Sequence, residues 1–312
     1  MRLVPQHSQS LRCRVRRRDG LFGPALTLIL TINLLAAEPF TLASARTAAG
    51  KANAQALYFL GKRYAKGDGV PQDYARAAEY LHLSTEKGYA LAQNDLGAFY
   101  AKGLGVKQDY AEAARWYRKA AEKGDALAQC SLGRAYWLGR GVATNMPASL
   151  KWLHQAAKQN QPDAMQFLGE IYLNGAPGIK ADRRQAFHWF LQAADQERAG
   201  ALYSLGQLFE AGNGVTRNLG LALNCYRKAA EKGDSLAMMR LSELSLPGSE
   251  GEADVIEAFK WLRLAGLHGN GSANHLIIEL SMDGRITTQQ YDEACRRADD
   301  FQRAFGKTPA KQ

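Results

Sequence analysis

Residues 91–124 read LAQNDLGAFYAKGLGVKQDYAEAARWYRKAAEKG, and this stretch decides the fold. Each half is rich in alanine, with apolar residues three and four positions apart, which is the spacing of an amphipathic α-helix. Gly103 and Gly105 separate the two halves and mark a turn, because glycine adopts backbone conformations that other residues avoid. The stretch therefore predicts a helix, a glycine turn and a second helix.

The same pattern recurs along the chain with a period of about 36 residues. Leu-Gly pairs stand at 60–61, 96–97, 132–133, 168–169 and 205–206, and degenerate copies follow at Leu241-Ser242 and Leu276-Ile277. The one added residue lies in the turn Gly175–Gly178, where an insertion costs least. A constant period of this size is typical of repeat proteins, in which each repeat is one supersecondary unit.

Other positions of the repeat keep the same phase. An aromatic residue lies four positions after the leucine, and a glycine pair and then an Asp or Asn follow it. Gly88, Gly124 and Gly233 are expected to end second helices in a left-handed conformation, which Asn160 also tolerates. The Asp or Asn is expected to cap the second helix by accepting a hydrogen bond from a free backbone N–H. The expected caps are Asp73, Asp109, Asn145, Asp182, Asn218 and Asp254.

These units predict an all-α solenoid of about six full helix-turn-helix repeats, a partial seventh and a C-terminal capping helix. One helical pair cannot bury its apolar face alone, so stacked pairs share a continuous core. We assign residues 46–283 to the solenoid, and the seventh unit keeps only its first helix, from Ser272 to Met282. Thr287 and Gln290 have the spacing of a capping box and open the capping helix, assigned to 284–305. Residues 306–312 are expected to form a disordered tail.

The repeat pattern A-x-x-x-L-G-x-x-Y-x-x-G-x-G-V-x-x-D-x-x-x-A-x-x-W-Y-x-x-A-A-x-x-G resembles the Sel1-like repeat, a member of the tetratricopeptide-like superfamily. The resemblance covers about Ala54 to Gly269. It implies a right-handed α/α solenoid with a concave surface that is used mostly for contact with other proteins. It does not imply a reaction.

Residues 1–45 have the composition of an export signal. The first 20 residues are basic, the next 16 are mostly apolar and uncharged, and Ala43-Ser44-Ala45 supplies the small-x-small pattern for signal peptidase. The apolar run is short for a transmembrane helix. We expect cleavage after Ala45 or after Ala37, which gives a periplasmic or secreted protein. The alternative is an uncleaved signal that anchors the chain in the inner membrane, and Arg17-Arg18 leaves twin-arginine export open.

Composition and charge limit the kinds of partner. Hydrophobic residues make up 46% of the chain, which is too apolar for a wholly disordered protein. The formal net charge is +10, and the export segment accounts for +4 of it. Because the remaining excess is mild and export is expected, we do not expect nucleic acid as a partner.

Catalytic and metal-binding patterns are weak, and we predict neither a cofactor nor a metal. The histidines lack ligand spacing, and His82 and His154 occupy equivalent places on second helices. Cys130, Cys225 and Cys295 are expected to be buried free thiols. Residues 84–87 spell S-x-x-K, the nucleophile motif of penicillin-binding enzymes, but equivalent segments read Ala-Ala-Glu-Lys, and no S-D-N or K-T-G follows. We therefore predict a protein that is not an enzyme, with a β-lactamase-like hydrolase as the alternative.

The resemblance also points to candidate partner-binding residues. In tetratricopeptide-like arrays the first helices line the concave face, and the positions two before, two after and six after the repeat leucine point into it. In this chain the basic candidates lie in the first three units and the acidic ones in later units, which fits a partner with acid at one end and base at the other. The candidates are Tyr58, Lys62, Lys66, Asn94, Lys102, Arg134, Gln166, Glu170, Asn174, Tyr203, Gln207 and Glu243.

Taken together, the sequence predicts an exported repeat scaffold that mediates protein–protein interaction through its concave face. Cell-envelope regulation and contact with a host or partner cell are the expected settings. The alternative is an envelope enzyme or a protein that binds peptidoglycan or β-lactams. The partner is expected to be a protein or peptide, and the chain a monomer or a weak homo-oligomer.

Overall fold

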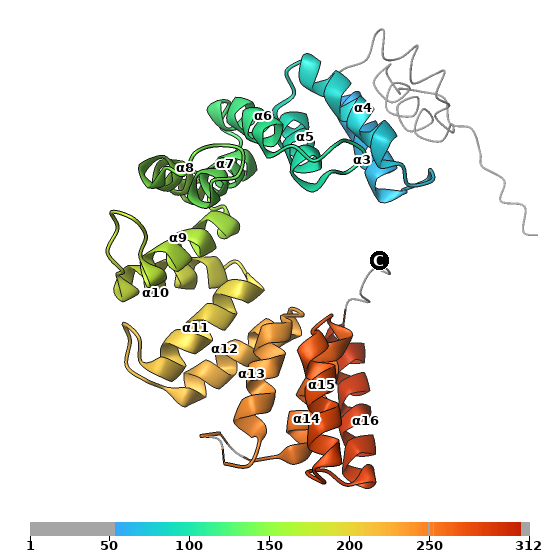
Figure 1. Ribbon diagram of the computed structural model, residues 1–312, viewed down its shortest axis with the longest axis vertical. Helices are drawn as coiled ribbons and strands as arrows, with labels where there is room; N and C mark the ends of the chain where they lie inside the picture. Colours follow the sequence, from blue (N-terminus) through green and yellow to red (C-terminus); the bar gives the residue numbers. More distant parts are fainter. Residues whose placement is uncertain (1–53, 249, 252, 307–312) are drawn as a thin grey trace, which may run out of the picture. The chain divides into compact units, whose positions relative to one another are not determined.

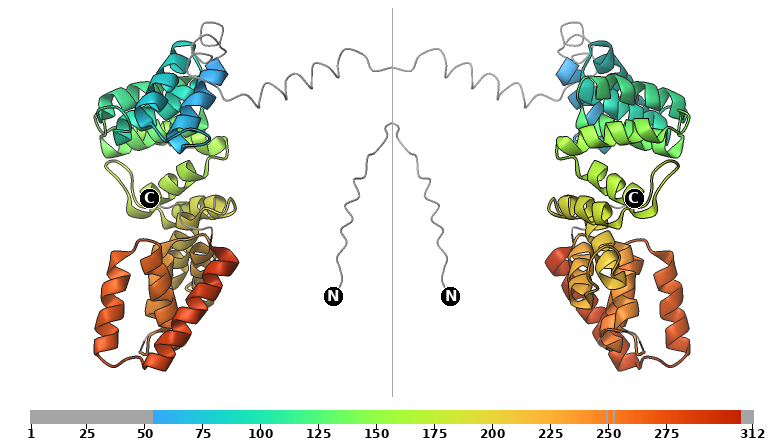
Figure 2. Two further views of the ribbon diagram at one scale, coloured as in Figure 1. Left: turned by 90° about the vertical axis from the view of Figure 1, so that its right-hand side faces the viewer. Right: turned by 90° about the vertical axis from the view of Figure 1, so that its left-hand side faces the viewer.

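The computed structural model describes residues 54–248, 250–251 and 253–306, and these residues form fourteen helices and no strand (Figures 1 and 2). The predicted export signal and residues 307–312 lie outside the described ranges. Within those ranges, no helix combines the length and the apolar character needed to cross a bilayer. The helices are α3 (Ala54–Lys66), α4 (Tyr74–Glu86), α5 (Ala90–Lys102), α6 (Tyr110–Glu122), α7 (Ala126–Leu138), α8 (Met146–Lys158), α9 (Pro162–Asn174), α10 (Arg183–Ala194), α11 (Ala199–Ala211), α12 (Leu219–Glu231), α13 (Ser235–Ser245), α14 (Val255–Leu267), α15 (Gly271–Met282) and α16 (Thr288–Phe305).

The helices pair in chain order, and each pair packs against the next. In each of the first six units the first helix contacts the second, and the second contacts the first helix of the following unit. Figure 1 shows these pairs following one another from α3 and α4 to α13 and α14. The arrangement confirms the predicted all-α solenoid.

The predicted capping side chains begin the second helices. Thr287 and Gln290 form a reciprocal capping box at the start of α16. Gly88, Gly124 and Asn160 have φ angles of 80°, 92° and 59°, as expected where a second helix ends. Glu197 has a φ of 58° in the corresponding place after α10. The six residues that each accept a hydrogen bond from a backbone N–H in the first turn of a second helix are Asp73, Asp109, Asn145, Asp182, Asn218 and Asp254.

The glycine of each Leu-Gly pair lies inside a first helix, where glycine costs about 1 kcal/mol relative to alanine. Packing explains its presence, because a bulky side chain of the second helix lies directly on it. A Cβ at Gly97 would stand 2.8 Å from the ring of Tyr117, and a Cβ at Gly169 would stand 2.6 Å from the ring of Phe190. The same contact joins Gly61 to Leu81, Gly133 to Leu153 and Gly206 to Tyr226.

In units two, three and five, the second glycine of the turn packs against the preceding unit. A Cβ at Gly105 would overlap the backbone of Tyr74, and a Cβ at Gly141 would overlap the backbone of Tyr110. Tyr74 and Tyr110 are the first residues of α4 and α6, which belong to the preceding units. The glycine turns therefore allow close packing between units as well as reversal of the chain.

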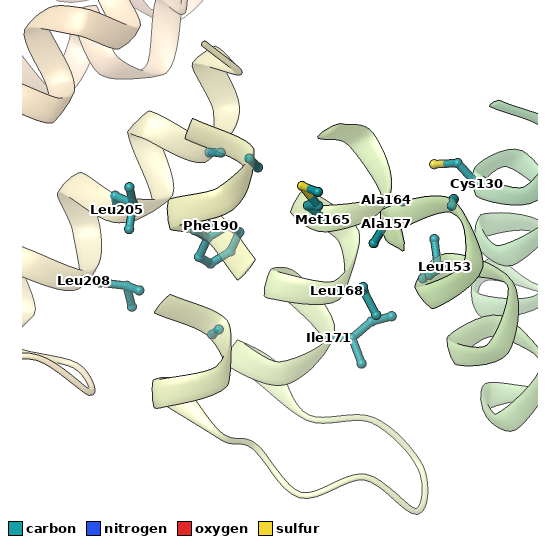
Figure 3. Packing of buried hydrophobic residues seen from close by; sticks show 14 of the residues in the cluster. Cys130, Leu153, Ala157, Ala164, Met165, Leu168, Ile171, Phe190, Leu205 and Leu208 are labelled. Carbon is teal, nitrogen blue, oxygen red and sulfur yellow. The ribbon is translucent and has the colours of Figure 1, made fainter. Parts of the chain in front are cut away.

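An apolar core continues from unit to unit. In the middle of the array one cluster joins Leu153 of α8, Leu168 of α9 and Phe190 of α10, and it extends to Leu205 of α11. Figure 3 shows Met165 and Leu168 of α9 between Leu153 and Phe190. Each first helix thus buries side chains against its own unit and against its neighbour.

The C-terminal end of the array departs from the repeat. Ala273 of α15 is buried at the position that Ala237 occupies in α13. The predicted degenerate pair Leu276-Ile277 is therefore wrong by one residue, and Ile278 stands where the other units have the helix glycine or Ser242. The last helix, α16, packs against α14, where the rings of Phe301 and Trp261 meet edge to face with centroids 5.1 Å apart. Because α16 lies on α14, the bulky Ile278 is accommodated and keeps 58% of its surface exposed.

The described histidines and cysteines of the repeats serve packing. The rings of His82 and His154 contact Trp116 and Trp189 of the following units, with centroids 5.9 and 5.4 Å apart. Cys130 is buried, and burial raises the pKa of its thiol to about 12. The cysteines at 130, 225 and 295 are all free, as predicted, but Cys225 and Cys295 are half-buried and the prediction that they are buried is wrong.

Replacing Gly206 by alanine should destabilise the protein although alanine is the better helix former. The added methyl group would overlap the ring of Tyr226, which is fully buried and cannot withdraw. Overpacking of this kind costs about 1–3 kcal/mol, against a gain of about 1 kcal/mol in helix propensity. We expect a net loss of up to about 2 kcal/mol in the free energy of unfolding, measured by urea denaturation.

Gly220 provides the matched control, since a Cβ there meets only Asn218 Oδ1, at 3.4 Å. Gly220→Ala should leave stability unchanged or raise it by up to about 1 kcal/mol. Equal effects of the two substitutions would contradict the proposed role of the helix glycine.

Candidate protein-binding surface

The predicted candidates lie on the first helices of the six units, which are α3, α5, α7, α9, α11 and α13. We use the term first-helix surface for the side chains of these helices at the positions one and two before the repeat leucine and at the positions two to six after it. Most of the candidates predicted from the sequence are accessible on this surface. Asn94 differs, because it is buried with only 8% of its surface exposed. Those that are half-buried are Tyr58, Lys62, Gln166, Glu170 and Tyr203, and those that are exposed are Lys66, Lys102, Arg134, Asn174, Gln207 and Glu243.

A cleft of about 830 Å³ opens on the first-helix surface between units five and six. Tyr203 and Gln207 of α11 and Glu243 of α13 line it, so the structure brings three of the candidates together. Its volume is within the usual range for binding clefts. The other lining residues are Glu210, Ala211, Arg217, Arg240, Leu244, Gly248 and Glu250.

Arg240 is the centre of the charge network in this cleft. Its Nε donates a hydrogen bond to Glu210 Oε2 at 3.0 Å, and its Nη2 contacts the other carboxylate oxygen of Glu210. Its Nη1 donates to Glu243 at 2.5 Å. The hydroxyl of Tyr226 donates to Glu210 at 2.7 Å. Because bidentate pairs fix the plane of the guanidinium, Arg240 is held in one orientation across the two units.

The network also fixes the protonation of its members. Hydrogen bonds from Arg240 and Tyr226 and the charge of Arg240 lower the pKa of Glu210, although burial acts the other way. Burial and the neighbouring Glu210 carboxylate raise the pKa of Tyr226, so its phenol remains a donor at neutral pH. Arg217 pairs with Glu250 at the edge of the cleft. Two arginines and three glutamates therefore give the lining a net charge of −1.

A second cluster lies between units one and two. Lys62 Nζ is 2.7 Å from Asp95 Oδ2 and 5.7 Å from the ring centroid of Tyr58. The ring centroids of Tyr58 and Tyr89 are 5.2 Å apart. Burial, together with the charge and hydrogen bond of Asp95, raises the pKa of Tyr58 to about 12. We call Tyr58, Lys62, Tyr89, Asp95 and Asp125 the acid–aromatic cluster.

Between the acid–aromatic cluster and the cleft, the side chains of the first-helix surface mostly contact other residues of the array. Gln166 donates a hydrogen bond to the Glu170 carboxylate at 3.0 Å, and Asn174 donates to the Glu170 backbone carbonyl at 3.1 Å. The guanidinium of Arg134 lies 5.6 Å from the ring centroid of Phe167 in the next unit. The middle of the surface therefore carries polar groups that already have partners.

These contacts modify the predicted separation of charge. Lys62 is paired with Asp95, and Glu243 shares Arg240 with Glu210. In the described part of the chain, no carboxylate pairs with Lys66, Lys102 or Arg134. Free basic charge thus lies in the first three units, while arginine offsets much of the acid in units five and six.

Asp95, Glu210 and Arg240 are not among the site residues predicted from the sequence. Asp95 and Arg240 both precede the repeat leucine by one position, where the side chain reaches the neighbouring unit. The variety of residues at this position was a usable signal, because packing positions keep one residue type. From unit one to unit six the residues are Phe59, Asp95, Ser131, Phe167, Ser204 and Arg240.

The serine of the S-x-x-K segment has a structural role. Ser84 is completely buried, and its hydroxyl donates a hydrogen bond to the backbone carbonyl of Ala54 at 2.6 Å. The contact joins α4 to the start of α3.

Among the residues that the structure describes, no three His, Cys, Asp or Glu side chains are grouped to hold a metal ion.

Replacing Asp95 by asparagine should lower the pKa of Tyr58. The carboxylate opposes formation of the phenolate, so its removal should move the pKa from about 12 toward the ordinary value of about 10. An NMR titration of ¹³C-labelled tyrosines, with Tyr58→Phe to assign the resonance, measures this shift. Asp109→Asn removes a capping carboxylate of α6 instead, and it should leave Tyr58 unchanged. An unchanged Tyr58 in the Asp95→Asn variant would show that the two side chains do not interact.

Comparison with known proteins supports the fold. The chain is 30% identical to a Sel1 repeat protein from Oxalobacter formigenes, with a TM-score of 0.65 over 80% of this chain and 98% of that one. It is 21% identical to an immunity protein from Pseudomonas aeruginosa, with a TM-score of 0.51 over 70% of this chain and 83% of that one, a similarity of fold. A search of curated proteins finds no match.

A family model described as Sel1 repeat matches six consecutive segments, at residues 54–89, 90–125, 126–161, 162–197, 199–234 and 235–270. These segments coincide with the helix pairs from α3 and α4 to α13 and α14. Sel1 repeat proteins are protein-interaction scaffolds. The chain belongs to the Sel1 repeat family.

Proposed function

We propose that this protein is an exported scaffold that binds a segment of a partner protein on its first-helix surface, with the cleft between units five and six as the main binding site. The cleft carries this proposal, because it collects Tyr203, Gln207 and Glu243 into one concave site of about 830 Å³. A linear or looped segment of a protein suits a site that is lined by two successive repeats.

The chemistry of the cleft supports a protein partner. Tyrosine and arginine are the residues that most often dominate binding energy at protein interfaces. Tyr203 is half-buried and accepts a hydrogen bond from Gln207 at 3.1 Å, so its ring is already positioned. Arg240 is held by Glu210, which reduces the entropy lost on binding. The lining therefore offers an ordered aromatic face beside polar groups.

Support for export comes from the sequence of the first 45 residues. A basic start, a short apolar run and the Ala43-Ser44-Ala45 pattern together favour a cleaved signal. On this basis the protein works in the periplasm or outside the cell, in regulation of the envelope or in contact with a host or neighbouring cell.

Loss of the cleft side chains should abolish capture of the partner. The full chain, tagged at its C-terminus and expressed in its own cell, is cross-linked in place, and the proteins bound to it are identified by mass spectrometry. We expect a partner that the parent captures and the Tyr203→Ala/Gln207→Ala variant loses by about tenfold or more, since hot-spot truncations cost about 2 kcal/mol or more.

Tyr110 and Gln108 supply a matched control. Gln108 also donates a hydrogen bond to a tyrosine hydroxyl at 3.1 Å, but this pair lies at the start of α6, away from the cleft. Gln108→Ala/Tyr110→Ala should retain the partner. Loss of the partner in both double variants, or in neither, would contradict the assignment of the cleft.

Export should remove the first 37 or 45 residues. Mass spectrometry of the tagged protein from the envelope or medium is expected to find an N-terminus at Glu38 or Arg46. Intact protein in the membrane fraction would instead support the anchored alternative. Intact protein confined to the cytoplasm would contradict export.

A further inference from the structure

The ammonium group of Lys62 lies within the acid–aromatic cluster. Lys62 Nζ lies 2.7 Å from Asp95 Oδ2 and 5.7 Å from the centroid of the Tyr58 ring. A carboxylate and an aromatic face are the two groups that attract a cation most strongly in proteins. The contacts of Lys62 therefore define the chemistry that this cluster accepts.

The cluster holds more acid than Lys62 neutralises. Asp125, at the start of α7, lies close enough for the Asp95 charge to raise its pKa, in addition to the larger effect of burial. Both carboxylates also contribute to the raised pKa of Tyr58. Asp95 is the carboxylate that pairs with the ammonium group, and Asp125, which already accepts a hydrogen bond from the backbone N–H of Ala128 at 2.7 Å, adds negative charge nearby.

A buried acceptor beside Asp95 also lacks a donor. Asn94 is 8% exposed, its Nδ2 lies 3.5 Å from Asp95 Oδ1, and its Oδ1 has no hydrogen-bond partner. Buried polar groups without a partner are rare and call for an explanation. An ammonium or guanidinium group has several donors, which suits a place where acceptors outnumber donors.

An accessible apolar side chain borders the cluster. The centroid of the Phe59 ring lies 5.8 Å from that of the Tyr58 ring, and Phe59 is 54% exposed. The aliphatic part of a long cationic side chain would contact such a group while its charged end reaches Asp95.

We propose that the acid–aromatic cluster binds a lysine or arginine side chain of the partner protein, and that Lys62 occupies this place in the free protein as an internal competitor. This proposal rests on the proposed function, and it names the chemistry of the partner at units one and two. The side chains of Lys62 and Asp95 keep 39% and 20% of their surface exposed, so an external cation can reach the carboxylate, and a single lysine–carboxylate pair near the surface of a protein is weak. The proposal reverses the role predicted for Lys62 from the sequence, in which it attracts an acidic group.

Removal of Lys62 tests the proposal by the sign of its effect. The mature protein is passed over an immobilised peptide in which lysines alternate with glycine and serine, and over a counterpart with norleucine at each lysine. In 150 mM salt, Lys62→Gln should bind the lysine peptide about three- to fivefold more tightly than the parent, because the competing ammonium is gone. The norleucine peptide should show no such gain.

Lys66→Gln is the matched control, since it removes the same charge from an exposed residue of α3 that has no carboxylate partner among the described residues. It should bind the lysine peptide as the parent does. Adding Asp95→Asn to Lys62→Gln should abolish the gain. Weaker, equal or undetectable binding by Lys62→Gln, or an equal gain in Lys66→Gln, would overturn the proposal. Because cross-linked capture through the cleft is measured separately, this result would leave the proposed function standing.

Discussion

The contact between the helix glycine and the bulky residue of the second helix sets the geometry on which the rest of the array depends. Tyr117, Phe190 and Tyr226 each pack a ring where a first helix has no side chain. The two helices of a unit are thereby held close together, in one register. The turn glycines then place the next unit against the preceding one, as the contact of Gly105 with the backbone of Tyr74 shows. Regular stacking follows from these two contacts, and each requires a missing Cβ.

Such packing restricts some positions of the repeat and leaves others free. From unit two to unit six the repeat leucine is buried, and so are the helix glycines and the small residues of the second helices, whereas positions beside them on the first-helix surface reach the junction between two units. Lys62 meets Asp95, and Arg134 meets Phe167, at the same separation of 33 residues. One junction position thus carries an ion pair in one place and a cation–π contact in another. The chemistry of the surface can therefore change from unit to unit while the fold stays the same.

Sequence reasoning succeeded where a physical requirement repeats. Asp109 and Asn145 were recognised as caps, and Gly124 and Asn160 as helix ends, because each unit needs those conformations at the same phase. Sequence reasoning was less informative about the site. Asp95 and Arg240 have no counterparts at the same position of the other units, and they contact residues of neighbouring units. Glu210, for example, pairs with Arg240 30 residues later, and no repeat of that pair marks it in the sequence. The irregular turn after α13, which helps to line the cleft, departs from the pattern and was equally hard to place.

The internal ion pairs of the surface determine how a partner must bind. A partner group that approaches Asp95 or Arg240 replaces an existing contact, so the net gain is the difference between the new pair and the old one. Such exchange gives modest affinity but strong discrimination, because a group of the wrong charge meets a carboxylate or guanidinium that already has a better partner. The pair at Asp95 is a single, partly exposed contact, whereas the pair at Arg240 is bidentate and is supported by Tyr226. The two ends of the surface are therefore suited to different tasks. The cleft between units five and six has a lining held by a bidentate ion pair, and the acid–aromatic cluster has a single ion pair that, on our proposal, an external cation replaces.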